Sequence, residues 1–189
     1  MMKTAFIIGN GASRTSIDLT CLKDKGTIFG CNALYRDFSD YDFLVAIDDD
    51  IIIEVFEEAR DDRLIIPKEH DRWESKEYSN NRRRSNAGMN AMQEAIRREH
   101  NKLYCMGFDF MLKGEESTSN LYANTNGYGI ETHANINDNK YRVRYLKWFT
   151  QDNKDVSFTF VLPRDLQYES ISGANITGIY VDKFIEKFS

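Results

Sequence analysis

The sequence predicts an α/β protein: a single domain with a Rossmann-like, mostly parallel sheet and helices on both faces. Short apolar runs of strand length alternate along the chain with segments of helical spacing, which is typical of a parallel sheet. A length of 189 residues suits one domain, so residues 1–189 are treated as one unit. A hydrophobic content of 41%, with 13% aromatic residues, is enough to build a core.

The expected strands are short apolar runs that stop at glycine, proline or polar residues. They are residues 5–8, 27–29, 43–47, 64–66, 103–106 and 156–162. The expected helices have apolar residues on one face, or close the chain. They are residues 50–59, 88–98, 141–149 and 178–188.

Two polar segments interrupt this alternation. Residues 68–84 are highly charged and include three consecutive arginines, Arg82 to Arg84, which predicts an exposed loop. The arginines could instead neutralise a phosphate or an anionic acceptor. Residues 113–126 are rich in Ser, Thr, Asn and Glu and have no apolar period, so we expect a loop there. Residues 113–128 are the candidate lid over a ligand.

Composition and charge argue against several classes of protein. The formal net charge is −5, which disfavours general binding to nucleic acids or membrane surfaces. The three cysteines lack close metal-ligand spacing and indicate buried free thiols in a reducing compartment. The N-terminal apolar run is too short for a signal peptide, and no run approaches the roughly 18 residues of a membrane span. We therefore expect a cytoplasmic protein without a transmembrane segment.

A glycine-rich loop, Gly9-Asn-Gly-Ala-Ser13, follows the first expected strand. Ligands of open parallel sheets bind beyond the carboxyl ends of the strands, and glycine lets the backbone approach a phosphate closely. The alternative is an ordinary turn between a strand and a helix, and a short Gly-x-Gly pattern does not decide between them. A dinucleotide-binding loop would require a third glycine at Arg14, so the sequence disfavours NAD.

Four other segments place glycine or polar residues where strands end or helices begin. Asn32 directly follows one expected strand, and Gly107 and Asp109 follow another. The Ser-Asn-Ala-Gly sequence at 85–88 opens a helix, so its amides and hydroxyl could hold an anion or a ribose. His133 lies between the polar segment and the next expected helix.

The order and spacing of these segments resemble the bacterial sialyltransferases of glycosyltransferase family 42. That family has a Gly-Asn-Gly-Pro-Ser-Leu loop, an Ile-Asp pair, a Cys-Asn pair, a helix headed by Ser-Gly and a strand end reading Cys-Gly-Ile-Asp-Phe. The counterparts here are residues 9–13, 17–18, 31–32, 86–88 and 106–110. The resemblance covers roughly residues 4–48 and 85–162. Ala12 replaces the family's proline, Ala87-Gly88 replaces Ser-Gly, and the chain is shorter than typical members.

The resemblance implies an inverting glycosyltransferase whose donor is a cytidine monophosphate sugar, such as CMP-sialic acid, and which requires no metal or other cofactor. It implies that His133 is the general base and that tyrosines of the polar segment contact the donor phosphate. The nucleotide-binding residues that it implies are Gly9, Asn10, Gly11, Ser13, Asn32, Ala87, Gly88, Gly107, Asp109, Tyr122 and Tyr128. The family tends to form oligomers, so a homo-oligomer is expected, and the acceptor is not implied.

Taken without the resemblance, His133 allows two interpretations. An acceptor hydroxyl must lose its proton as it attacks the donor, and a histidine with a near-neutral pKa suits that task. The alternative is a surface histidine in a polar loop. His70 and His100 stand among charged residues, and we expect both to be solvated.

Asp48, Asp49 and Asp50 follow an expected strand and support a second hypothesis. Carboxylates at a strand end can hold Mg²⁺ or Mn²⁺ against a diphosphate, with Asp48 and Asp50 as the ligands. The chain would then resemble the archaeal-type pterin pyrophosphokinases, which have a similar Gly-x-Gly-Pro-Ser loop, and would use ATP. We favour the interpretation in which these aspartates cap the following helix and complement its dipole. A third hypothesis is a protein that binds a nucleotide without catalysis.

Overall fold

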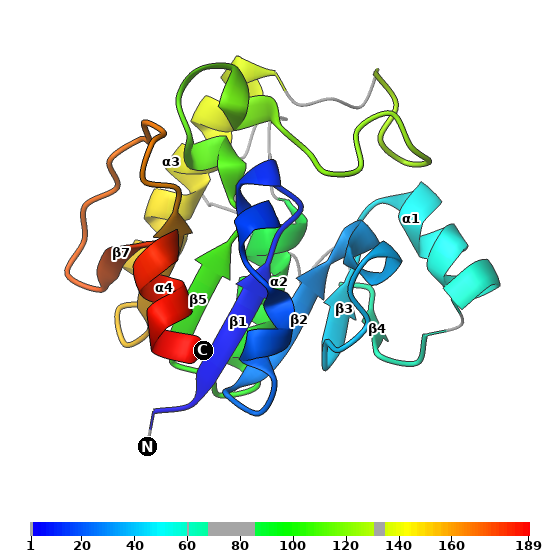
Figure 1. The fold of residues 1–189 in the computed structure, drawn as a ribbon, viewed down its shortest axis with the longest axis horizontal. Helices are drawn as coiled ribbons and strands as arrows, with labels where there is room; N and C mark the ends of the chain where they lie inside the picture. Colours follow the sequence, from blue (N-terminus) through cyan, green and yellow to red (C-terminus); the bar gives the residue numbers. More distant parts are fainter. Residues whose placement is uncertain (1, 60, 68–85, 131–134) are drawn as a thin grey trace.

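The computed structural model describes residues 2–59, 61–67, 86–130 and 135–189, and their strands form one parallel sheet. Seven strands are arranged in the order β4-β3-β2-β1-β5-β6-β7 (Figure 1). The predicted α/β, Rossmann-like fold is confirmed, and every pair of these strands is parallel. The strands are Thr4–Ile8 (β1), Thr27–Cys31 (β2), Phe43–Val45 (β3), Leu64–Ile65 (β4), Lys102–Met106 (β5), Ser157–Leu162 (β6) and Ile176–Tyr180 (β7).

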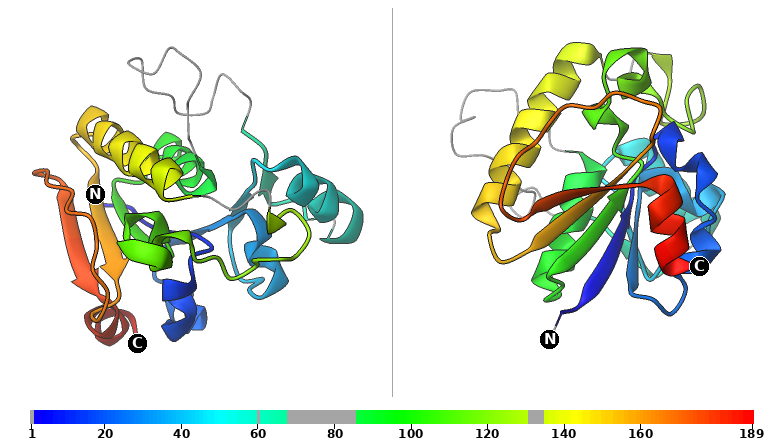
Figure 2. Two further views of the ribbon diagram at one scale, coloured as in Figure 1. Left: turned by 90° about the horizontal axis from the view of Figure 1, so that it is seen from above. Right: turned by 60° about the vertical axis from the view of Figure 1, so that its left-hand side comes forward.

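Helices cover both faces of the sheet, as Figure 2 shows. The α-helices of the described ranges are Asp49–Glu54 (α1), Ala87–Arg97 (α2), Ile136–Asp152 (α3) and Val181–Phe188 (α4). A π-helical turn, Val55–Ala59, continues α1. Helices α2 and α3 pack on one face, while α4 and the 3₁₀ helices that follow β1 and β2 pack on the other. No helix of the described ranges is both long and apolar enough to cross a membrane.

Alternate residues of each central strand face opposite cores. In β1, Ala5 and Ile7 belong to the core under α2 and α3, whereas Phe6 and Ile8 belong to the core under α4. Strands β1 and β5 contribute eight side chains to these two cores, and all eight are buried. Both strands are therefore covered on both faces. This explains why the sequence shows continuous apolar runs here rather than a polar alternation.

Successive strands are added to the sheet on one side of β1 up to β4, and on the opposite side from β5 onward. From β1 the chain builds β2, β3 and β4 on one side, and it returns through α2 to β5 on the other side. The loops after β1 and β5 lie against each other: the Gly9 amide donates to the Met106 carbonyl at 2.9 Å, and the Gly11 amide donates to Gly107 at 3.0 Å. A Cβ at Gly9 would lie 2.6 Å from the Gly107 oxygen, so this approach requires glycine. Ligands of such sheets bind at this switch point.

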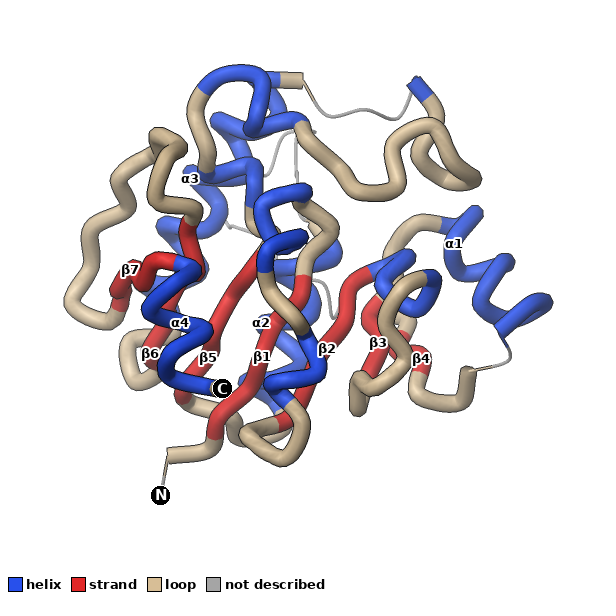
Figure 3. The backbone as a smooth tube through the Cα atoms, viewed as in Figure 1, coloured by secondary structure: helices blue, strands red, loops and turns tan. Residues whose placement is uncertain are grey.

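The C-terminal element differs from its prediction. Residues 178–180 were expected to start the last helix, but they belong to strand β7, and α4 begins only at Val181. Strand β7 lies at one edge of the sheet and follows a long loop from β6 (Figure 3). The helix expected at 141–149 is longer and forms α3, with a capping box between Asn135 and Asp138. The loop expected at residues 68–84 lies outside the described residues.

Candidate functional site

A pocket of about 830 Å³ opens beyond the carboxyl ends of β1, β2, β3 and β5. This volume lies within the range of small-molecule sites. Most of the predicted site residues line it, and so do the alternative metal ligands. These residues are Gly9, Asn10, Gly11, Asn32, Asp48, Asp50, Ala87, Gly88, Gly107, Asp109 and Tyr128. Ser13 and Tyr122 were also predicted to bind the ligand, but they are not among the described lining residues.

Ser13 is used inside the protein rather than at the pocket surface. Its backbone amide donates to the Asp109 carboxylate at 3.0 Å, and its hydroxyl donates a second, short hydrogen bond to the same group. The Ser119 hydroxyl also donates to Asp109, at 2.6 Å. A Cβ at Gly11 would collide with this carboxylate. The buried Asp109 side chain therefore joins the loops after β1 and β5, although one edge of the residue borders the pocket.

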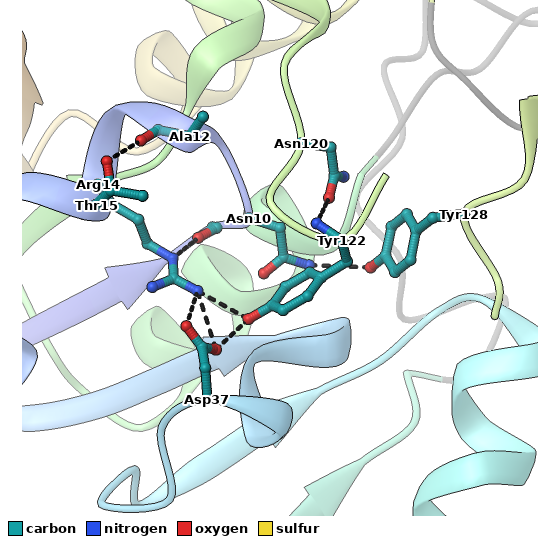
Figure 4. Close-up of polar contacts among 9 residues, drawn as sticks. Asn10, Ala12, Arg14, Thr15, Asp37, Asn120, Tyr122 and Tyr128 are labelled. Atoms are coloured by element: carbon teal, nitrogen blue, oxygen red, sulfur yellow. Dashed lines mark hydrogen bonds and ion pairs between the residues drawn. The ribbon is translucent and has the colours of Figure 1, made fainter. Parts of the chain in front are cut away.

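Tyr122 is likewise engaged in a buried cluster, which Figure 4 shows. Arg14 donates from Nε to the Gly9 carbonyl at 3.0 Å and from its terminal nitrogen to the Tyr122 hydroxyl at 2.8 Å. The same nitrogen pairs with Asp37 at 3.1 Å, and the Tyr122 hydroxyl donates to Asp37. Burial, followed by the hydrogen bond to Asp37, raises the pKa of Tyr122. Arg14, where a dinucleotide loop would have glycine, thus fixes the shape of this loop.

Tyr128, one of the predicted nucleotide-binding residues, lines the pocket and contacts Asn10. The Asn10 Nδ2 donates to the Tyr128 hydroxyl at 3.0 Å (Figure 4). Burial and, secondarily, the charge of Asp48 raise the pKa of Tyr128, so its phenol keeps its proton at neutral pH. The Asn10 Oδ1 is buried and has no hydrogen-bond partner within the described part of the chain. A buried acceptor without a partner is costly, so this oxygen suits a ligand that brings a hydrogen-bond donor.

The start of α2 forms another wall of the pocket. Asn86 caps the helix, because its Oδ1 accepts from the Met89 amide at 2.9 Å. Its Nδ2 is buried and lacks a partner among the described residues. The first amides of a helix have no intrahelical acceptor, so Ala87 and Gly88 present backbone donors here. A Cβ at Gly88 would lie 2.7 Å from the Phe108 ring, which explains the glycine. The family resemblance implies Ala87 and Gly88 but not Asn86, for which the position at the start of a helix is the signal in the sequence.

Asn32 links the ends of β2 and β3. Its backbone is left-handed, with a φ of 47°, and its Oδ1 accepts from the Ile47 amide at 3.1 Å. Its Nδ2 donates to Asp48 at 2.5 Å. Asn32 therefore holds the Asp48 carboxylate at the pocket as well as lining the pocket itself.

The aspartates at the start of α1 only partly match the capping prediction. Asp48 stands at the capping position, but its side chain makes no capping hydrogen bond to α1. Asp49 and Asp50 lie in the first turn, where negative charge complements the helix dipole. Across the described ranges, no group of three or more His, Cys, Asp or Glu residues is arranged to hold a metal ion.

The expected lid segment, residues 113–128, borders the pocket but is not featureless. It contains a 3₁₀ helix, Gly114–Thr118, in which Ser117 is buried and accepts from Asn139 of α3 at 2.7 Å. Further along, the Leu121 amide donates to the Asn10 carbonyl at 2.9 Å. The segment is therefore bonded at several points to the body of the protein, and its movement over a ligand stays a prediction.

Of the three histidines, the structure describes only His100, and it contradicts the prediction for that residue. His133 and His70 lie outside the described residues, so the general-base hypothesis stays a prediction. His100 was expected to be solvated, which is wrong: its side chain is buried, and burial lowers its pKa. Its ring nitrogens contact the Ala95 carbonyl at 3.0 Å and the Thr27 hydroxyl at 2.9 Å. His100 is thus a hydrogen-bonded core residue.

Comparison with known proteins found no match, whether against models of protein families, curated proteins or solved structures. The chemistry of the pocket is therefore inferred from its own residues. They offer helix and loop amides, a protonated phenol, two side-chain amides with an unused polar atom, and several carboxylates.

Proposed function

We propose that the pocket binds a nucleotide-activated sugar, with cytidine monophosphate as the nucleotide, and that the protein transfers the sugar to an acceptor hydroxyl. One observation carries the proposal: four of the five segments that resemble the sialyltransferase family converge on one pocket. They are residues 9–11, 31–32, 86–88 and 107–110, which are far apart in the chain. The pocket lies at the switch point of the sheet, where parallel α/β proteins bind their ligands.

The polar groups of the pocket suit a sugar phosphate. The amides at the start of α2 favour a phosphate oxygen, and the protonated Tyr128 phenol can donate to a second one. The unpartnered Asn10 Oδ1 requires a donor, such as a ribose or sugar hydroxyl. The unpartnered Asn86 Nδ2 requires an acceptor. Each unmet group costs about 1–3 kcal/mol, so a ligand that satisfies both is favoured.

The charge of the pocket favours a monophosphate over a polyphosphate. Of the described lining residues, four are aspartates (Asp48, Asp49, Asp50 and Asp109) and one, Arg142, is basic. A sugar linked to CMP carries one phosphate charge, whereas ATP carries several. Because like charges repel strongly in a partly buried site, ATP would require a cation to enter.

In the proposed reaction, His133 takes the proton of the acceptor hydroxyl as its oxygen attacks the anomeric carbon. The new bond to the acceptor forms as the bond to the phosphate oxygen breaks, so the sugar carbon is inverted and CMP leaves. Tyr128 would stabilise the charge that develops on the departing phosphate. The resemblance also favours a homo-oligomer.

A thermal-shift screen of CMP, CDP, UDP, GDP and ATP, with and without Mg²⁺, tests the ligand. A ligand at 100 times its Kd stabilises the folded state by about 2.7 kcal/mol, which is easily measured. We expect CMP to stabilise the protein most, without a requirement for Mg²⁺. Donor hydrolysis should then resist chelators and be lost in His133→Ala, while CMP binding is kept. Stabilisation by ATP with Mg²⁺ and none by CMP would contradict the proposal.

A second candidate function is supported by the aspartates Asp48, Asp49 and Asp50, which line the same pocket. It is a Mg²⁺-dependent pyrophosphokinase that uses ATP, with Mg²⁺ or Mn²⁺ held by Asp48 and Asp50. Such an enzyme should lose activity in Asp48→Asn and keep it in His133→Ala. A protein that only binds a nucleotide should retain its ligand in both variants and turn nothing over.

A further inference from the structure

Arg36 joins three separate parts of the structure just outside the pocket. It ends the 3₁₀ helix Asn32–Arg36 that follows β2. Its Nε and one terminal nitrogen donate to the Glu54 carboxylate of α1 at 2.7 and 2.6 Å. The nitrogen that contacts Glu54 at 2.6 Å also donates to the Asn126 carbonyl at 3.0 Å, and the other terminal nitrogen donates to the Thr125 hydroxyl at 2.7 Å. The Arg36 side chain is 19% exposed and that of Glu54 10%, so the pair is only partly exposed to water.

These bonds fix the segment that carries Tyr128, which we call the arm (residues 119–128). The Tyr128 amide donates to the Thr125 carbonyl at 2.9 Å, and the Asn124 amide donates to the Tyr128 carbonyl at 2.8 Å. Asn126 also donates to Glu54, at 2.6 Å. The turn that presents Tyr128 is therefore anchored to α1 through Arg36 and Glu54.

The guanidinium of Arg36 also faces the two aromatic rings of the arm. It lies 5.7 Å from the ring centroid of Tyr122 and 6.0 Å from that of Tyr128. The rings themselves are 5.9 Å apart. At these distances, a cation is attracted to the ring faces and holds the rings in place.

Tyr128 in turn orients Asn10 (Figure 4). Because the Tyr128 hydroxyl accepts from Asn10 Nδ2, the amide points its Oδ1 away from Tyr128 and leaves that oxygen without a partner. Arg36 itself does not line the pocket in the described residues. Its contacts nevertheless determine where a lining phenol and, through it, a lining amide are held.

We propose that Arg36 is a positioning residue of the ligand site: it holds Tyr128 against Asn10, so nucleotide affinity depends on a side chain that does not contact the nucleotide. The proposal rests on the proposed function, because it assumes that the ligand is a nucleotide in this pocket. It assigns the Arg36–Glu54 pair a task in binding that is distinct from the chemistry of transfer.

The test compares Arg36→Met with a matched control, Arg63→Met. Arg63 also pairs with a carboxylate, Asp61 at 2.8 Å, and also lies over an aromatic ring, that of Tyr41 at 4.1 Å. It is not among the described residues of the pocket. Titration calorimetry with CMP should give a Kd about tenfold weaker in Arg36→Met and unchanged in Arg63→Met. Amide hydrogen exchange should become faster in residues 119–128 of Arg36→Met alone.

A double-mutant cycle with Tyr128→Phe separates positioning from a general loss of stability. If Arg36 acts through Tyr128, Arg36→Met should weaken CMP binding much less in the Tyr128→Phe background than in the wild type. Arg36→Lys provides a second variant that keeps a cation beside Glu54. Lysine cannot make the forked contacts to Glu54, Thr125 and Asn126 at once. Arg36→Lys should therefore also bind CMP with a higher Kd than the wild type.

The outcomes are distinguishable. If the wild type binds no nucleotide, the proposed function fails and the role of Arg36 fails with it. If the wild type binds CMP but both Arg36 variants keep its Kd, only the positioning role is overturned. Fully additive effects of the Arg36 and Tyr128 substitutions would also overturn it.

Discussion

Two arginines hold the same arm from different sides, and they differ in what they join. Arg14 is 4% exposed and contacts Tyr122 together with the backbone of the glycine loop itself. Arg36 contacts the other half of the arm and the end of α1, and it is partly exposed. Arg14 therefore lies inside the glycine loop, whereas Arg36 lies outside the pocket lining and joins the arm to α1.

The comparison indicates that burial and partner type decide whether an arginine acts on stability or on binding. Without Arg14, the Gly9 carbonyl and the Tyr122 hydroxyl would each lose a buried donor. Without Arg36, the lost contacts are those of the turn before Tyr128, which water can partly replace. We expect the first loss to affect folding and the second to affect the ligand.

The largest effect is expected for Arg14→Met. Removing the guanidinium leaves buried polar partners unsatisfied, which should cost about 2–4 kcal/mol of unfolding free energy. Arg36→Met should cost less, about 1–2 kcal/mol, because its surroundings are more exposed. Urea denaturation of both variants against the wild type measures the difference. Equal losses of unfolding free energy in the two variants would contradict the proposal that Arg14 acts mainly on folding and Arg36 mainly on binding.

A smaller, pH-dependent effect is expected for Glu54→Gln. Hydrogen bonds from Arg36, more than any other group, lower the pKa of Glu54 from its ordinary value of 4.5 to about 2. Because the folded-state pKa is lowered, this carboxylate stabilises the protein fully above pH 4.5 and loses its contribution as the pH falls toward 2. Glu54→Gln should therefore cost about 1–2 kcal/mol at pH 7 and progressively less below pH 4.5.

Asp61→Asn is the control for that measurement. Arg63 similarly lowers the pKa of Asp61 from 3.8 to about 2, so its stabilising effect is lost in a similar acidic range. Of these two variants, Glu54→Gln alone should also weaken CMP binding, because Glu54 contacts the arm through Asn126 and Arg36. Urea denaturation between pH 2.5 and 7 measures the free energy of unfolding of both variants, and calorimetry at pH 7 measures their Kd for CMP. A weaker Kd in Asp61→Asn would contradict it.

The sequence predicts most of the fold because the central strands carry their own signal. Strands β1, β5 and β6 are buried apolar runs, and each was predicted within one residue. Strand β7 was missed because it is a largely exposed edge strand with Thr177 and Gly178 inside it. Its position is determined by pairing with β6, and a local pattern does not contain that information.

The pocket was predictable to the extent that strand ends determine it. Asn32 and Gly107 follow a strand directly, Asn10 follows one after a single glycine, and the ends of parallel strands meet at one edge of the sheet. The partners of the two arginines were not predictable from local spacing. Arg14 meets Tyr122 across 108 positions of sequence, and Arg36 meets Thr125 across 89. Such pairs arise only once the arm has folded over the loop.

Ser13 shows the same limit, and it supplies the smallest of these predictions. The resemblance implies that the Ser13 hydroxyl binds the nucleotide, but in the structure this hydroxyl donates to Asp109. Asp109 keeps the Ser13 amide and Ser119 as donors, so Ser13→Ala should cost only about 1 kcal/mol of unfolding free energy. Its Kd for CMP should stay within about twofold of the wild type, whereas Asn10→Ala should weaken binding about tenfold. Calorimetry on both variants measures this contrast. A large loss of affinity in Ser13→Ala would mean that the loop rearranges to bring its hydroxyl to the ligand.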